Sequence, residues 1–308
     1  MREERVTDSE PRSKTRAFRC GFIAIVGAPN AGKSTLLNRL VGQKIAITSK
    51  KPQTTRNRIT GIRHHENAQL IFVDTPGIHR ASKQLNVRIV ETALGTLESV
   101  DVIVFVVDAS RKDEASETMI RKALDRIDRP VVLALNKVDL VQKSALLAGI
   151  DQRSKLRSFE AIVPISAKTG DQVSVLAEVI ENLLPVGPPL FPEDSVTDLP
   201  MRFLAAEIVR EKVFRYTGQE IPYSTMVTID DYKEEKRITH IHATIHVERD
   251  SQKRIVIGQG GAMLKRIGEA ARIEIETMIE SRVFLHLFVR VDTNWSRDAK
   301  VLERICNP

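Results

Sequence analysis

The sequence has little cysteine and no long apolar run, and each shortage excludes a class of protein. Its 308 residues include 2 cysteines, Cys20 and Cys306, which lie near opposite ends and predict neither a disulfide framework nor a cysteine-based metal site. The longest obvious apolar run, residues 102–107, is far shorter than the roughly 20 residues that span a bilayer. We therefore expect a cytoplasmic protein.

The remaining composition fits a globular protein with room for two domains. Hydrophobic residues make up 42% of the chain, and its length allows each domain its own core. Residues 1–17 carry both charge signs without an apolar stretch, so we expect a mobile tail rather than a signal peptide. The net charge of +7 is compatible with a nucleic-acid partner but does not require one.

The clearest chemical motif is G-A-P-N-A-G-K-S, residues 27–34. It lies between an apolar run at 22–26 and a helical leucine pattern, the strand–loop–helix context of a phosphate-binding loop. Backbone N–H groups there would bind phosphates, Lys33 would neutralise the β- and γ-phosphates, and Ser34 would ligate Mg²⁺. The residues expected to contact the nucleotide are Gly27, Asn30, Ala31, Gly32, Lys33, Ser34 and Thr35.

Two later segments are predicted to sense the γ-phosphate. The polar stretch 43–58 contains P-Q-T-T-R, from which we choose Thr55 over Thr54 as a hydroxyl that reaches Mg²⁺. The apolar run 70–73 ends in D-T-P-G, where Asp74 would hold Mg²⁺ through its water shell and Gly77 would turn its N–H toward the phosphate. The predicted metal set is Ser34, Thr55 and Asp74, and the predicted catalytic set is Asn30, Lys33, Thr55 and Gly77.

A third motif, N-K-V-D after the apolar run 131–135, predicts which base is bound. The Asp139 carboxylate accepts from two adjacent guanine donors, whereas adenine would present an acceptor to it. Asn136 would tie the base to the loops, and the Lys137 stem would cover the base plane. After strand 162–165, the Ala167 N–H is expected to read the guanine carbonyl. The predicted base site comprises Asn136, Lys137, Asp139, Ser166, Ala167 and Lys168.

Alternating strands and helices with functional loops at strand ends predict an α/β P-loop nucleotide domain. We expect a doubly wound, mostly parallel sheet over residues 18–185. Prolines between 185 and 200 predict a stiff, non-helical linker, residues 186–200. A smaller α+β domain is expected at 201–308, with strands at 223–229, 238–247 and 283–291 and helices at 201–216 and 262–279.

The second domain contains G-Q-G-G between an apolar segment, 254–257, and a helix. A G-x-x-G loop clamps the nucleic-acid backbone in KH domains, although many such turns merely begin a helix. Residues 251–268 contain four basic residues and no acid. The RNA-binding residues predicted here are Gly258, Gln259, Gly260, Gly261, Lys253, Arg254, Lys265 and Arg266.

The polar faces of two predicted strands carry histidine and phenylalanine side chains. His240, His242 and His246 share one face of 238–247, while Phe284 and Phe288 lie on the polar face of 283–291. We interpret both as solvated or partly covered outer faces, because no cysteine or acidic cluster supports a metal site. Base stacking is the alternative for the second strand.

Taken in order, these motifs resemble the Era family of bacterial GTPases from about Phe18 to the C-terminus. The resemblance implies a type II KH domain that binds the single-stranded 3′ end of small-subunit ribosomal RNA, with GTP favouring the RNA-binding form. It also implies a role in small ribosomal subunit assembly and peripheral association with the inner membrane. We expect a monomer that uses GTP or GDP with Mg²⁺.

One position constrains the mechanism. Ile78 stands where Ras-type enzymes have the glutamine that orients the attacking water. We therefore expect slow intrinsic hydrolysis, or water positioned by backbone groups or a partner. Asn30 is expected to hold a monovalent cation, K⁺, against the phosphates, as in similar GTPases with asparagine there. Two functions of the C-terminal domain remain possible from the sequence: it binds RNA, or it binds a protein or membrane surface.

Overall fold

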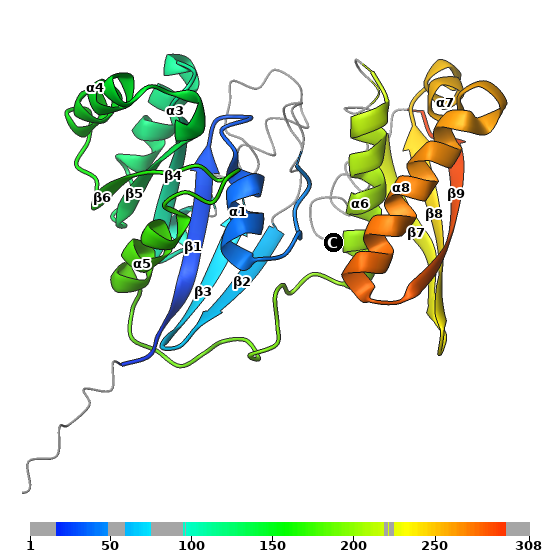
Figure 1. Cartoon of the computed structure of the whole chain (residues 1–308), viewed down its shortest axis with the longest axis horizontal. Helices are drawn as coiled ribbons and strands as arrows, with labels where there is room; N and C mark the ends of the chain where they lie inside the picture. Colours follow the sequence, from blue (N-terminus) through cyan, green and yellow to red (C-terminus); the bar gives the residue numbers. More distant parts are fainter. Residues whose placement is uncertain are drawn as a thin grey trace, which may run out of the picture.

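The computed structural model of the chain describes residues 17–48, 59–74, 95, 97–218, 221 and 225–293. These form two domains joined by an extended segment (Figure 1). Among the sequence-predicted residues, Thr55, Gly77 and Ile78 lie outside the described ranges. The predicted tail, residues 1–17, lies outside them except for Ala17.

The first domain is built on a six-stranded sheet in the order β2-β3-β1-β4-β5-β6. Its strands are β1 (Arg19–Gly27), β2 (Ile59–His65), β3 (Ala68–Asp74), β4 (Val102–Asp108), β5 (Val131–Asn136) and β6 (Ala161–Pro164). Its helices are α1 (Lys33–Val41), α3 (Glu114–Leu124), α4 (Lys143–Ser154) and α5 (Val173–Leu183), with a 3-10 turn η1 (Val138–Leu140). The central pairs are parallel and the edge strand β2 is antiparallel to β3, which confirms the mostly parallel sheet.

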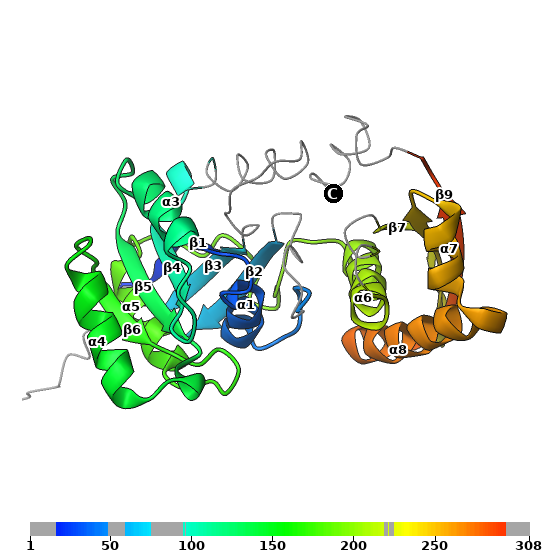
Figure 2. The same ribbon diagram turned by 90° about the horizontal axis from the view of Figure 1, so that it is seen from above.

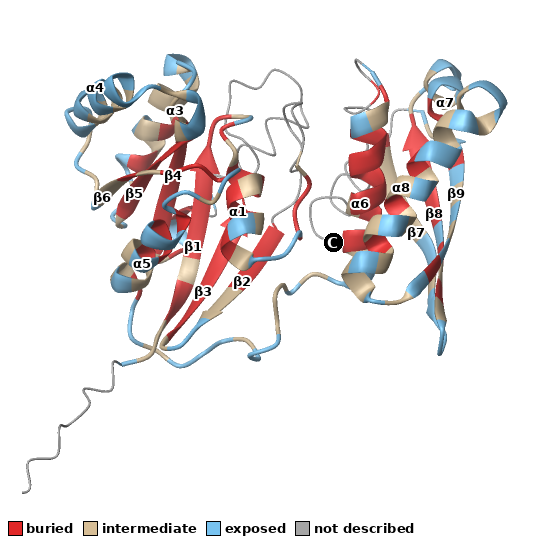
Figure 3. Ribbon diagram, in the orientation of Figure 1, coloured by how far each residue is buried: buried red, intermediate tan, exposed pale blue. Residues whose placement is uncertain are grey.

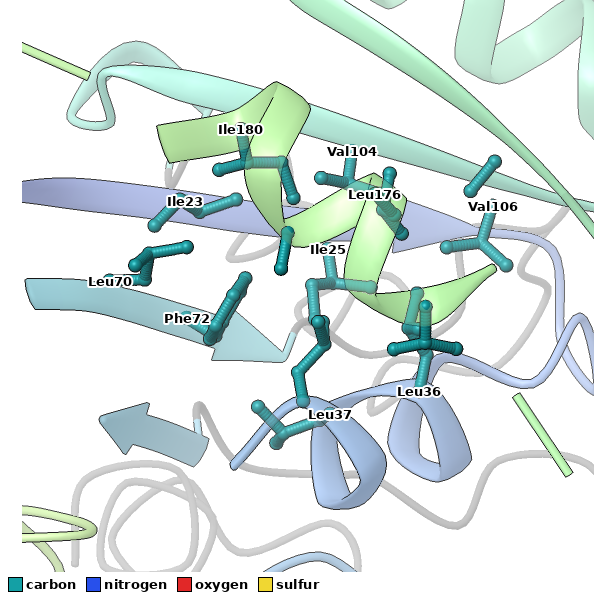
Figure 4. Close-up of a cluster of buried hydrophobic side chains, with 14 of the residues drawn as sticks. Ile23, Ile25, Leu36, Leu37, Leu70, Phe72, Val104, Val106, Leu176 and Ile180 are labelled. Carbon is teal, nitrogen blue, oxygen red and sulfur yellow. The ribbon is translucent and has the colours of Figure 1, made fainter. Parts of the chain in front are cut away.

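Alternate side chains of the strands supply a core on each face of this sheet. Ile23 and Ile25 of β1 pack against α1 and α5 together with β3 and β4 side chains (Figure 4). Ala24 and Val26 face the opposite side and pack in a second cluster with α3. Because both faces of the sheet are covered, its strands are nearly continuous apolar runs. The parallel strands run in the same direction, so their C-terminal ends lie at one common edge of the sheet. That edge is where a ligand site forms in open α/β sheets.

The linker is hydrogen-bonded along the edge of the first domain. The side chain of Gln69, which is fully buried, accepts from the N–H groups of Leu190 (2.7 Å) and Phe191 (3.0 Å) and donates to the Phe191 carbonyl (2.7 Å). Further along, the Ile62 N–H donates to the Val196 carbonyl at 2.9 Å. Residues 187–200 contain no helix or strand, and these hydrogen bonds attach the segment to β2 and β3.

The second domain has a three-stranded sheet in the order β7-β8-β9, with β8 antiparallel to β7 and parallel to β9. Its elements are α6 (Met201–Tyr216), β7 (Thr225–Glu234), β8 (Ile238–Val247), α7 (Asp250–Ile257), η3 (Gln259–Gly261), α8 (Ala262–Ile279) and β9 (Arg282–Val291). The predicted apolar segment 254–257 is the last turn of α7. The G-x-x-G loop therefore joins two helices. In the described part of the chain, no helix is both long and apolar enough to span a membrane.

Helix α6 lies between the second sheet and the first domain (Figures 1 and 2). It is buried on most sides (Figure 3), and even Arg210, Glu211 and Lys212 are only 3–5% exposed. The segment after α1 contacts it: Ile45 and Ile47 line a small cavity with side chains of α6 and α8. Because α6 has neighbours on two sides, its buried positions do not follow a single amphipathic stripe.

Candidate functional site

The phosphate loop fills the turn between β1 and α1 at the common edge of the sheet. Gly32 has a φ of 99°, and a Cβ there would lie 2.2 Å from Asn136 Nδ2. At Gly27 a Cβ would lie 2.4 Å from the Val106 carbonyl oxygen. Both positions therefore require glycine, one for backbone conformation and both for space. The loop ends at the N-terminus of α1, where unpaired N–H groups attract anions.

Lys33 is the buried cation of this loop. It is 6% exposed, and its ammonium donates to the carbonyl oxygens of Gly27 and Ala28, both at 3.1 Å. Burial lowers its pKa to about 8, while the nearby Asp74 carboxylate opposes that shift. A polyphosphate would add the negative charge that favours the ammonium form. The Lys33 ammonium therefore lies against the backbone of the loop itself.

Ser34 and Asp74 form the part of the predicted Mg²⁺ set that the structure describes. The Ser34 hydroxyl donates to Asp74 Oδ2 at 2.7 Å, and the Asp74 side chain is fully buried at the end of β3. A hydroxyl and a carboxylate are hard oxygen ligands of the kind that Mg²⁺ prefers. This donor set fits a bound Mg²⁺.

Asn136 connects three loops beneath the predicted base site. Its Nδ2 donates to the Ala31 carbonyl at 2.7 Å, and its Oδ1 accepts from the Ala167 N–H at 2.9 Å. The structure therefore brings the phosphate loop, the N-K-V-D turn and the S-A-K turn together. It also qualifies one expectation: the Ala167 N–H already donates to Asn136, so it could read a guanine carbonyl only as a shared donor.

The remaining base-site residues are oriented by their own partners. The fully buried Ser166 donates from its hydroxyl to Asp139 Oδ1 at 2.7 Å, leaving the exposed carboxylate held at the mouth of the site. Lys137 has a φ of 67° and its ammonium pairs with Asp108 Oδ2 at 2.5 Å. This ion pair fixes the Lys137 stem, which we expected to cover the base plane.

One cavity of about 1160 Å³ joins the phosphate loop and the base site. This volume lies slightly above the range of about 300–1,000 Å³ that is usual for small-molecule sites. Residues of the predicted nucleotide set that line it are Asn30, Ala31, Gly32, Lys33, Ser34, Thr35, Asn136, Lys137, Asp139, Ala167 and Lys168. The wall also includes Glu211, Phe214 and Arg215 of α6, which no motif in the sequence indicated.

The predicted RNA loop is open on its outer side. Gly258, Gly260 and Gly261 have φ values of 74°, 57° and 80°, and a Cβ at Gly260 or Gly261 would meet nothing within 4 Å. Gln259 and Gly260 are exposed. A ligand backbone can therefore approach the main chain at the start of α8, where phosphates favour the helix N-terminus.

The four predicted basic residues surround this loop on different sides. Arg254 and Lys265 are exposed, and within the described residues neither makes a cation–π contact with an aromatic ring. The Lys253 ammonium lies 5.8 Å from the Phe288 ring centre on β9. The Arg266 guanidinium lies 4.4 Å from the Tyr216 ring on α6. Basic charge thus extends from the loop toward both β9 and α6.

The comparisons with known proteins agree with this arrangement. Residues 22–137 match the family model of a 50S ribosome-binding GTPase, and residues 220–296 match that of a KH domain. The chain is 53% identical over 290 residues to the GTPase Era of Geobacter metallireducens and 52% identical over 289 residues to that of Geotalea uraniireducens. Each alignment covers 94% of this chain and 97% of the relative. The chain belongs to the Era family.

Two solved Era structures match the whole architecture. Each is 41% identical, with a TM-score of 0.89, and covers 93% of this chain and 98% of the other. One is Era in complex with MgGDPNP and nucleotides 1506–1542 of 16S ribosomal RNA, and the other is an Aquifex aeolicus Era variant bound to GDP·AlF4⁻. As a member of this family the chain is a GTPase with a P-loop domain and a C-terminal KH domain, which uses GTP or GDP and Mg²⁺.

Sequence reasoning missed an ion-pair cluster between the two domains. Lys44, just after α1, pairs with Glu211 of α6 at 2.7 Å and with Glu274 of α8, and Lys212 also pairs with Glu274. Burial alone would lower the pKa of Lys44, but its bonds to Glu211 and Glu274 outweigh this and raise it. Each residue reads as an ordinary surface charge in the sequence, so no local pattern identifies the cluster.

Proposed function

We propose that this chain is a GTP-hydrolysing switch that binds the single-stranded 3′ end of small-subunit ribosomal RNA and assists maturation of that subunit. The observation that carries this proposal is that one chain has both a cavity running from the phosphate loop to Asp139 and an open glycine loop. A solved relative that contains both MgGDPNP and 16S ribosomal RNA supports joint binding of the two ligands.

Within the nucleotide site, Lys33 and the backbone N–H groups of the loop neutralise phosphate charge as it develops during hydrolysis. Bound Mg²⁺, held by Ser34 and Asp74, would supply further charge neutralisation between the phosphates. Asp139 selects guanine by accepting two hydrogen bonds, and Ser166 holds that carboxylate in place at 2.7 Å. Thr55 and Gly77 keep their predicted roles at the γ-phosphate.

We assign Asn30 the role of a monovalent-cation ligand. It is exposed in the phosphate loop with a φ of 64°, and it lines the nucleotide cavity. An amide oxygen beside the phosphates can ligate K⁺, which would stabilise charge that no glutamine stabilises here. Hydrolysis should then be faster in K⁺ than in Na⁺ at equal ionic strength, and Asn30→Ala should remove that difference. Equal rates in both salts would rule out this role.

The domain contact supports a link between nucleotide and RNA. Helix α6 lines the nucleotide cavity with Glu211, Phe214 and Arg215 and packs its other side against the KH sheet. Lys44 lies between α1 and the predicted γ-phosphate sensor and is paired with α6 and α8. We infer that bound GTP alters this contact, so that GTP favours the RNA-binding form.

On the resemblance alone, we also propose a monomer that works in the cytoplasm and meets the inner membrane peripherally. The alternative hypothesis is that the second domain binds a protein or membrane surface instead of RNA. The match of residues 220–296 to a KH domain favours RNA, because the G-x-x-G loop of that domain clamps nucleic-acid backbones.

The test is a double substitution, Gln259→Asp with Gly260→Asp, which places two carboxylates where phosphates would approach. We expect loss of single-stranded RNA binding with GTP hydrolysis nearly unchanged, because the catalytic loops lie in the other domain. A control with the same charge change, Gln142→Asp with Ser144→Asp, adds acids at the exposed start of α4, where they favour the helix dipole. If the Gln259→Asp/Gly260→Asp variant binds RNA as tightly as the parent, the loop does not bind RNA, and a protein or membrane partner for the second domain is favoured instead.

A further inference from the structure

The outer face of strand β9 carries exposed rings at alternate positions. Phe284 and Phe288 are 50% and 56% exposed, and His286 between them is also exposed. Val283 and Val289 point the other way into the core of the domain. Large apolar side chains gathered on an open face mark an interaction site more often than isolated ones do.

The rings of Phe284 and His286 lie against rings of the neighbouring strand. Strands β8 and β9 are parallel and place His240 beside Phe284 and His242 beside His286. The ring centres of His240 and Phe284 are 5.5 Å apart, and those of His242 and His286 are 5.4 Å apart. The ring planes are tilted by about 45° rather than stacked. Part of each face therefore stays open to another flat group.

Charge on this sheet is divided between its two edges. Arg282 and Arg290 lie exposed near the two ends of the edge strand β9, and Arg290 pairs with Asp292 at 3.1 Å. The opposite edge, β7, carries exposed acids, among them Asp230 and Asp231. A polyanion is therefore favoured along β9 and disfavoured along β7.

Phe288 lies near the helix that leads to the predicted RNA loop. Lys253 of α7 lies 5.8 Å from the Phe288 ring centre, and α7 runs directly into Gly258. Since β9 is an edge strand, a chain that leaves the loop can pass over this edge to the outer face.

We propose that the outer face of β9 is a second contact surface for single-stranded RNA, on which bases beyond the loop stack on Phe284, His286 and Phe288. This proposal rests on the proposed function of the Gly258–Gly261 loop. The recognised groups are the π-faces of bases, since exposed aromatic side chains on a sheet stack two or three bases in RRM domains. Side chains two apart on a strand are separated by about 6.6 Å, which suits successive unstacked bases.

The experiment compares two RNAs with the parent chain and with the double variant Phe284→Ala/Phe288→Ala. The short RNA spans only the loop, and the long one extends the same sequence on both sides, with 2-aminopurine in the extensions. The parent should bind the long RNA more tightly and change the 2-aminopurine fluorescence. The double variant should bind the short RNA like the parent, while its affinity for the long RNA falls about fivefold or more for each ring lost.

Two control variants accompany the experiment. Phe284→Tyr/Phe288→Tyr keeps the rings and should keep the affinity for the long RNA, whereas Ile273→Ala removes an exposed apolar side chain of α8 (58% exposed) and should change nothing. If the parent does not bind the short RNA, the proposed function of the loop fails. If the parent binds the short RNA and the double variant still binds the long one as tightly as the parent, the second surface is refuted. Loss of small-subunit binding with unchanged affinity for both RNAs also refutes it and reassigns the face to a protein contact.

Discussion

Asn136→Ala should loosen the nucleotide site more than any other single truncation of a side chain that contacts no phosphate. The side chain is 2% exposed and its two hydrogen bonds, of 2.7 Å and 2.9 Å, end on the Ala31 carbonyl and the Ala167 N–H. Truncation leaves both backbone groups without this partner, at about 1–3 kcal/mol for each buried group. Because the cavity lets water reach them, we expect the lower part of the range, about 3 kcal/mol in total.

That loss should lower the melting temperature of the nucleotide domain by about 6–12 °C and weaken GDP binding as well. Calorimetric unfolding and GDP titration measure the two effects. Asn38→Ala is a matched control, because Asn38 accepts from Ile45 and Ala46 and donates to the Ala46 carbonyl at 2.8 Å, away from the base site. It should cost stability while leaving guanine affinity close to that of the parent. Parent-like unfolding and GDP affinity in Asn136→Ala would refute the claim that this side chain holds the three loops.

Three further predictions concern charge. Asp139→Asn should shift preference from guanine to xanthine nucleotides, since an amide donates to the xanthine carbonyl, and an unchanged guanine preference in a competition titration would remove Asp139 from the base site. The pKa of Lys33 is lowered to about 8, so the empty protein should gain stability as pH rises from about 8 toward the unfolded value near 10.4. GDP binding should take up a proton at pH 8.5 and almost none at pH 7, and calorimetry in two buffers showing equal uptake would contradict this. Glu274→Gln, which weakens the pairs with Lys44 and Lys212, should preserve GTP hydrolysis but reduce the effect of nucleotide on RNA affinity; undiminished coupling would exclude the cluster.

Much of the nucleotide domain was predictable because its strands are buried on both faces. Such strands appear as short apolar runs, and each polar motif that follows one lies at the same edge of the sheet. Strand β2 and helix α4 were not predicted. β2 is an edge strand whose last residues, Arg63 to His65, are partly exposed and polar, and α4 has no buried residue to impose an apolar stripe.

In the second domain, the sequence indicated the glycine loop but not its setting. Residues 254–257 look like a strand because Ile255, Val256 and Ile257 are β-branched. Packing of Val256 in the domain core overrides that preference and makes the segment the end of α7.

The contacts of the first domain with the linker and with the second domain could not be predicted from the sequence, for a different reason. Gln69 binds the linker and Lys44 binds α6 and α8 across more than 100 residues of sequence. Neither contact leaves a periodic or motif signal, since one polar residue pairs with another that only the fold brings near.

Control of RNA binding by the nucleotide can be measured in one titration. The affinity of the chain for a single-stranded RNA matching the 3′ end of small-subunit ribosomal RNA is measured with Mg²⁺ and either GDP or a non-hydrolysable GTP analogue. We expect RNA to bind at least about fivefold more tightly with the analogue, the lower end of typical coupling between two sites. The same affinity in both nucleotide states would contradict this expectation.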